Sequence, residues 1–137
     1  MPNPHHSNTN DPNLSILVVE DSPSQALKLK LALENNGCHV EWTETGLDGL
    51  GMAQQKDFDL IVLDVELPDI NGFEVCKRLK ADPALNDIPV VMLTTLDQAE
   101  NVMSGLEAGA VDYIPKDAFA EVVLMETIRQ MNQRAGQ

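Results

Sequence analysis

The sequence predicts an α/β protein in which a parallel β-sheet is covered by helices on both faces. Apolar, β-branched stretches alternate five times along the chain with stretches of helical character. This alternation implies right-handed crossover connections and a parallel sheet. In addition, Leu60–Leu63 is apolar at every position, which is typical of a strand that is buried on both faces. We find no internal repeat and no second domain, so we expect one folded unit.

The first strand and the first helix are predicted in residues 15–36. Ser15–Val19 is apolar and β-branched, and it stops abruptly at two carboxylates. A helix is then signalled by a capping side chain followed by Pro23, and Gly37 closes it after Asn36. Leu27–Leu33 alternates with period two, which alone would indicate a strand. We favour a helix because its start signal, length and lack of β-branched residues agree.

The later elements follow from the same signals. We expect strands at Cys38–Trp42, Leu60–Leu63, Ile88–Leu93 and Val111–Pro115, and helices from Thr43 or Thr45 to about Gln55, from Gly72 to about Lys80, from about Ala99 to Ala108 and from near Asp117 onward. The last helix is expected to use Phe119, Val122, Val123, Met125, Ile128 and Met131 as its apolar residues.

Composition limits the possible partners and the location. With 9 basic and 22 acidic residues, the net charge of −13 argues against a nucleic-acid or anionic-membrane surface. No stretch approaches the roughly 18 apolar residues that a membrane span requires, so we expect a cytoplasmic protein. Cys38 and Cys76 form no C-x-x-C pattern and are expected to be buried. We expect residues 1–13 to be a disordered tail, 14–134 the folded domain and 135–137 a short tail.

Polar side chains follow four of the five predicted strands. Glu20 and Asp21 follow the first, Asp64 the third, Thr94 the fourth and Lys116 the fifth. A parallel sheet gathers these carboxyl ends at one edge, where ligands collect in open α/β sheets. Carboxylates about 4 Å apart repel by about 4 kcal/mol at an effective dielectric constant of about 20, so positive charge is required. Lys116 offers one charge, and three carboxylates with loop carbonyls suit Mg²⁺.

This arrangement of residues suits phosphoryl transfer. A metal ion and an ammonium group would neutralise charge on the oxygens of the transferring group. Asp64 is then the best candidate nucleophile, because the other two carboxylates are paired as metal ligands. On local grounds alone, Asp64 is equally well read as a side chain that caps the following turn.

The sequence also resembles the receiver domains of two-component response regulators, from about Leu14 to Met131. The motifs that carry the resemblance are Val-Val-Glu-Asp-Ser at 18–22, Leu-Asp at 63–64 followed by Pro68 and Gly72, Met-Leu-Thr-Thr at 92–95, and Gly-Ala-Val-Asp-Tyr-Ile-Pro-Lys at 109–116. Their separations also fit the family. The resemblance implies a flavodoxin-like fold, with five parallel strands in the order 2-1-3-4-5 and five flanking helices.

By the same resemblance, Asp64 would accept a phosphoryl group. Glu20, Asp21 and Asp64, with the backbone carbonyl of Glu66, would bind Mg²⁺. Thr94 and Tyr113 would form the switch pair that responds to phosphorylation, and Lys116 would pair with the phosphoryl group. One departure is that Asp117 follows the Lys where the family usually has Pro, and Pro115 precedes it.

Three functions remain open at this point. The first is a signalling module that is not an enzyme. It would receive phosphate from a sensor histidine kinase or phosphotransfer protein and act on a downstream protein, or form a homodimer, through the face of helix 4, strand 5 and helix 5. The second is a pseudo-receiver that acts as a scaffold without phosphorylation, favoured by the Lys116-Asp117 departure. The third, ranked last, is an aspartate-nucleophile phosphatase, which would need an Asp where Glu66 stands.

Overall fold

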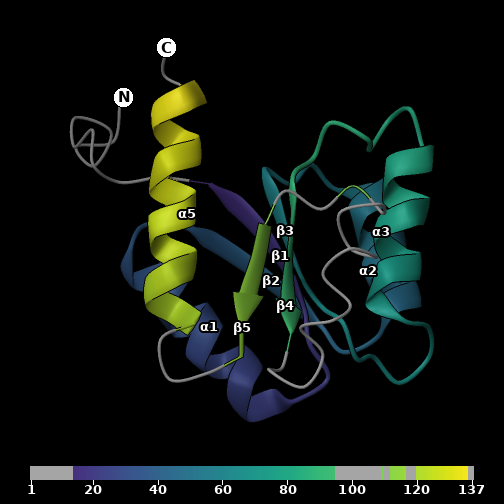
Figure 1. Ribbon diagram of the computed structural model, residues 1–137, viewed down its shortest axis with the longest axis horizontal. Helices are drawn as coiled ribbons and strands as arrows, with labels where there is room; N and C mark the ends of the chain where they lie inside the picture. Colours follow the sequence, from purple (N-terminus) through teal and green to yellow (C-terminus); the bar gives the residue numbers. More distant parts are fainter. Residues whose placement is uncertain (1–13, 95–108, 110–111, 117–119, 136–137) are drawn as a thin grey trace.

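A computed structural model describes residues 14–94, 109, 112–116 and 120–135 of the chain. Strands and helices alternate from residue 15 to residue 94, as predicted, and a fifth strand and a last helix follow (Figure 1). The strands are β1 (Ser15–Val19), β2 (His39–Thr43), β3 (Leu60–Asp64), β4 (Val90–Thr94) and β5 (Asp112–Pro115), and the helices are α1 (Pro23–Asn35), α2 (Gly46–Gln55), α3 (Gly72–Ala81) and α5 (Ala120–Ala135). The helix expected at about Ala99–Ala108 lies outside the described residues.

The five strands form one parallel sheet in the order β2-β1-β3-β4-β5, which confirms the predicted topology. The chain moves outward from β1 to β2 on one side and from β3 through β4 to β5 on the other. The carboxyl ends of β1 and β3 therefore mark the point where the winding direction reverses. In doubly wound sheets this switch point opens a crevice in which ligands bind.

The helices cover both faces of the sheet. Helices α1 and α5 lie on one face, and α2 and α3 lie on the other (Figure 1). Side chains alternate between the faces along each strand, so Ile16 and Val18 pack toward α1 and α5 while Leu17 and Val19 pack toward α2 and α3. The predicted burial of both cysteines is confirmed, with one free cysteine in each core.

The conflicting signals over residues 27–33 resolve in favour of a helix. Ser22 precedes α1 and Pro23 is its first residue, although the Ser22 side chain makes no capping hydrogen bond. Leu29 and Leu33 are buried four residues apart, whereas Leu27 and Leu31 are 55% and 51% exposed. The period-two alternation is thus produced by leucines on opposite sides of one helix.

The prediction for the apolar face of the last helix was partly wrong. Helix α5 buries Ala120, Leu124 and Ile128, which are spaced four residues apart. Val122 and Val123 are 66% and 39% exposed instead. The helical repeat of 3.6 residues places one stripe against the sheet, and these two valines fall outside that stripe.

Candidate functional site

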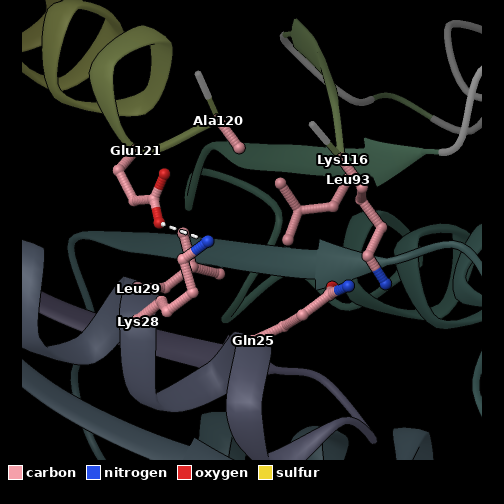
Figure 2. A pocket seen from close by; sticks show the side chains of 7 residues that line it. All are labelled: Gln25, Lys28, Leu29, Leu93, Lys116, Ala120 and Glu121. Atoms are coloured by element: carbon pink, nitrogen blue, oxygen red, sulfur yellow. Dashed lines mark ion pairs between the residues drawn. The ribbon is translucent and has the colours of Figure 1, made fainter. Parts of the chain in front are cut away.

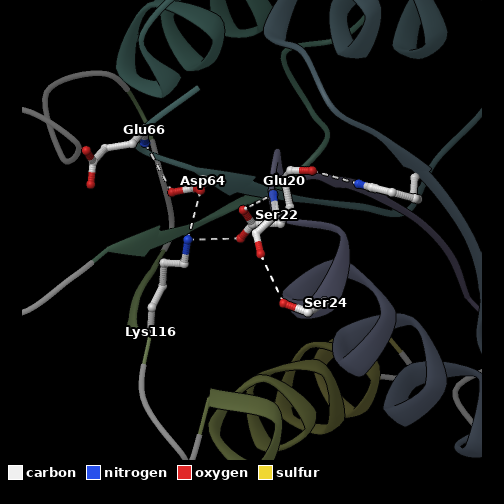
Figure 3. Close-up of polar contacts among 7 residues, drawn as sticks. Glu20, Ser22, Ser24, Asp64, Glu66 and Lys116 are labelled. Carbon is white, nitrogen blue, oxygen red and sulfur yellow. Dashed lines mark hydrogen bonds and ion pairs between the residues drawn. The ribbon is translucent and has the colours of Figure 1, made fainter. Parts of the chain in front are cut away.

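Asp64 is the last residue of β3 and is only 2% exposed. One of its carboxylate oxygens, Oδ1, accepts a hydrogen bond from the backbone N–H of Glu66 at 3.1 Å. The other, Oδ2, accepts a hydrogen bond from the Lys116 ammonium at 2.9 Å (Figure 3). Asp64 therefore caps the following turn and also contacts a positive charge. Its environment fits both the turn-capping role and the nucleophile role considered from the sequence.

Glu20 directly follows β1, and its side chain is fully buried beside Asp64. Its Oε2 accepts the backbone N–H of Ser22 at 3.1 Å, and its Oε1 forms an ion pair with Lys116 Nζ at 3.0 Å (Figure 3). Among the described residues no donor offers Oε1 a well-aligned hydrogen bond. Burial has the largest effect on the pKa of Glu20, and the adjacent Asp64 carboxylate adds to it; together they raise this pKa to about 7.

Lys116 follows β5 and provides the positive charge of the site. Its backbone N–H donates to the Thr94 carbonyl at 2.7 Å, which extends the pairing of β4 and β5 by one bond. Its side chain is 13% exposed and reaches both buried carboxylates. Burial alone would lower the pKa of Lys116, but its hydrogen bond to Asp64 and its charge interactions with Asp64 and Glu20 raise it.

Three carboxylates gather at this sheet edge, as the strand ends predicted. Glu20, Asp21 and Asp64 each offer an oxygen, and these oxygens lie within 4.8 Å of one another. Asp21 is exposed, whereas the other two are buried. With one lysine against three carboxylates, the cluster keeps an excess of negative charge. It is an all-oxygen donor set that is open to solvent on the Asp21 side, and this chemistry suits a hard divalent cation.

The loop between β3 and α3 is fixed at several points. The Gly72 N–H donates to the Val65 carbonyl at 2.9 Å. A Cβ at Gly72 would lie 2.2 Å from the Asp64 carbonyl oxygen, so only glycine allows this close approach. The Asp69 carboxylate accepts the Gly46 and Leu47 N–H groups at the start of α2, both at 2.8 Å. Although burial opposes it, these bonds lower the pKa of Asp69. The backbone around Glu66 is thereby anchored between two helices.

The remaining predicted site residues are placed as follows. Thr94 ends β4, is 6% exposed and pairs with Pro115 of β5. Glu66 is exposed and lies two residues after Asp64, the last residue of β3. The backbone of Tyr113 pairs with Met92. The side chain of Tyr113 and the whole of Asp117 lie outside the described part of the chain.

A cavity of about 170 Å³ adjoins the acidic cluster (Figure 2). It lies between α1 and the start of α5, where Lys28 and Glu121 pair at 3.6 Å. The lining residues are Gln25, Lys28, Leu29, Leu93, Lys116, Ala120 and Glu121. Lys116 is shared by the cavity and the cluster, so this cavity belongs to the surroundings of the same site.

Sequence reasoning missed two residues that shape the backbone of the site. The Trp42 indole N–H donates to the Glu20 carbonyl at 2.7 Å across 22 residues of chain. Ser22 was expected only as the last residue of the motif at 18–22, but its backbone N–H donates a hydrogen bond to the Glu20 carboxylate. No sequence signal identifies the Trp42 contact, because it depends on the pairing of β2 with β1.

A doubly wound α/β domain that gathers a buried aspartate, an acidic pair and a lysine at the carboxyl edge of its sheet has the architecture of a signal receiver domain. The sequence model of the response regulator receiver domain matches residues 16–129. The chain therefore belongs to the response regulator receiver domain family, as the sequence motifs indicated.

Individual relatives agree with this assignment. Protein PilH of Pseudomonas aeruginosa is 38% identical over 80% of this chain and 90% of its own length. The DNA-binding dual master transcriptional regulator RpaA of Synechocystis is 39% identical, also over 80% of this chain, but the match covers only 45% of that protein. The chain thus spans about half the length of several curated relatives, and nearly all of PilH.

A solved structure gives the same result. The signal receiver domain of a signal transduction histidine kinase from Syntrophus aciditrophicus has a TM-score of 0.80 and 38% identity. The match covers 88% of this chain and 90% of that one. No helix within the described residues has the length and apolar character needed to cross a membrane.

Proposed function

We propose that this domain receives a phosphoryl group on Asp64 from a phosphohistidine of a sensor histidine kinase or phosphotransfer protein. The observation that carries the proposal is the ion pairing of Lys116 with both Asp64, at 2.9 Å, and Glu20, at 3.0 Å. In the transfer, an Asp64 carboxylate oxygen attacks phosphorus and forms a P–O bond. The P–N bond to the donor histidine breaks, and the imidazole leaves with the bonding electron pair.

The donor atoms of the site fit Mg²⁺, which we propose as its cofactor. Glu20, Asp21 and Asp64 would hold the ion, together with the backbone carbonyl of Glu66. The buried Glu20 Oε1, which lacks a well-aligned hydrogen bond within the described residues, supports this assignment. When bound, the ion would supply positive charge to the oxygens of the transferring group.

Lys116 is the residue that would respond first to phosphorylation. Its ammonium already lies against the carboxylate that would be phosphorylated, so a phosphoryl oxygen can replace Asp64 Oδ2 as its partner. We assign the Thr94 hydroxyl and Tyr113 to the switch that reads this change. The resulting population shift would act on the face formed by the helix expected at Ala99–Ala108, β5 and α5, which would bind a downstream protein or a second copy.

Incubation with Mg²⁺ and acetyl phosphate, followed by intact-mass measurement, tests the proposal. We expect an acid-stable, base-labile gain of one phosphoryl group that is absent in Asp64→Asn. Asp57→Asn is the matched control, because Asp57 is an exposed aspartate that lies shortly before the first residue of β3, at the end of the strand away from Asp64. This variant should be phosphorylated like the wild type.

The other outcomes of this experiment are equally informative. No mass gain in the wild-type protein would overturn the proposal in favour of a scaffold that works without phosphorylation. Continuous turnover of varied phosphate esters would instead indicate a phosphatase.

A further inference from the structure

The backbone of Glu20 is held by strand β2 on both sides of the residue. Its N–H donates to the Thr43 carbonyl at 3.0 Å. Its carbonyl accepts the indole N–H of Trp42 at 2.7 Å. Glu20 lies beyond the end of β1, so these two bonds fix a residue that is no longer part of the strand. The peptide that links Glu20 to Asp21 is therefore anchored to the edge strand of the sheet.

The indole bond replaces one that the sheet can no longer supply. Val18 pairs with Trp42 and Val19 with Thr43, so a continued parallel ladder would next offer the Thr45 N–H to the Glu20 carbonyl. At Thr45, however, the chain leaves the sheet, because this residue caps α2. The Trp42 side chain, half-buried against the core under α1, supplies the donor instead. Without it, this carbonyl would lose its partner at the carboxyl end of the sheet.

The position of this peptide determines where two carboxylates lie. The side chain of Glu20 is fully buried, so the position of its backbone determines the position of its carboxylate. Asp21 is exposed, so its side chain is not held in place by burial. Its backbone nitrogen is bonded to the Glu20 carbonyl carbon, whose oxygen accepts the Trp42 hydrogen bond. Any shift of that carbonyl would move both acidic side chains relative to Asp64. Groups that orient metal ligands in this way affect affinity without touching the metal.

We propose that Trp42 is a positioning residue for the acidic pair and sets the affinity of the site for Mg²⁺. The inference rests on the proposed metal site. Trp42→Phe is the direct test, because phenylalanine keeps an aromatic ring on β2 but has no N–H to donate. The affinity for Mg²⁺ should fall roughly ten-fold, at the lower end of the range seen when outer partners of metal ligands are lost. The number of bound ions should stay the same.

Titration with MgCl₂, followed by ¹H–¹⁵N NMR, gives the affinity from the Ser22 and Glu66 amides, which donate to the carboxylates of the site. Val40→Ala is the matched control. It removes two buried methyl groups from the same edge strand but leaves the indole bond in place. We expect this variant to bind Mg²⁺ with wild-type affinity. Equal losses in the two variants would show a general effect of destabilising β2 and would overturn the proposal.

A second readout uses the wild-type protein, whose single tryptophan gives one indole N–H signal. This signal should shift on saturation with Mg²⁺. If Trp42→Phe fails to fold, as judged by circular dichroism, an unchanged indole signal would overturn the inference. If the wild type binds Mg²⁺ and Trp42→Phe binds it equally well, only the inference fails. If the wild type binds no Mg²⁺, the proposed metal site fails with it.

Discussion

Glu20→Gln should stabilise the metal-free protein at alkaline pH, although it removes a proposed metal ligand. Glu20 is fully buried beside Asp64, and its pKa is raised to about 7 from an ordinary value of 4.5. Above pH 7 the folded protein must keep this carboxylate ionised within the cluster. Glutamine has nearly the same shape and can still accept the Ser22 N–H, but it carries no charge.

The magnitude follows from the difference in proton binding between the two states. Between pH 4.5 and pH 7 the folded wild type holds a proton on Glu20 that the unfolded chain has lost, so its free energy of unfolding falls as the pH rises. At about 1.4 kcal/mol per pKa unit, the full loss above pH 7 is about 3 kcal/mol. Glutamine avoids this loss. Its advantage should be about 3 kcal/mol near pH 8.5 and about 1 kcal/mol near pH 5.5.

Urea unfolding followed by far-UV circular dichroism, with EDTA present, measures this difference at the two pH values. Glu34→Gln is the control, because it makes the same substitution at an exposed position of α1 and should change stability by about 0.5 kcal/mol or less. Saturating Mg²⁺ should then stabilise the wild type and narrow its gap to Glu20→Gln. The reasoning is refuted if Glu20→Gln is less stable than wild type near pH 8.5, or if its advantage does not shrink at lower pH.

Two further predictions concern the packing that supports the site. Gly72→Ala should lower the free energy of unfolding by about 1–3 kcal/mol and weaken Mg²⁺ binding, because the new methyl group would collide with the Asp64 backbone. This prediction would be contradicted if the variant gave the same urea unfolding and Mg²⁺ titration curves as the wild type. On α5, Leu124→Ala should cost about 2–5 kcal/mol in urea unfolding, whereas Val122→Ala should cost about 0.5 kcal/mol or less, because Leu124 is buried and Val122 is 66% exposed. Similar losses in both would place the buried face of α5 elsewhere.

The fold was predictable because each buried strand can be located from a short local pattern in the sequence. The buried run Leu60–Leu63, for example, is apolar at every position, and Asp64 marks the carboxyl end of its strand. Parallel pairing then gathers Asp64, Glu20 and Lys116 without further information. The start of the first helix was also predictable, because Pro23 lies at the first position of α1.

What could not be predicted depends on contacts between distant segments. The bond from the Trp42 indole to the Glu20 carbonyl requires the register of β2 on β1, which no local pattern encodes. The need for glycine at position 72 likewise comes from the close approach of α3 to the end of β3. Val122 was misplaced because an apolar residue on a helix gives no sign of which side faces the sheet unless its neighbours form a continuous stripe.

The central claim is that Asp64 is the residue that accepts the phosphoryl group. Borohydride reduction after incubation with Mg²⁺ and acetyl phosphate tests it most directly, because it converts an aspartyl phosphate to homoserine, which peptide mass spectrometry locates in the chain. We predict homoserine at position 64 and at no other carboxylate. Reduction at another carboxylate, or no reduction in a sample that carries the phosphoryl mass, would contradict the assignment.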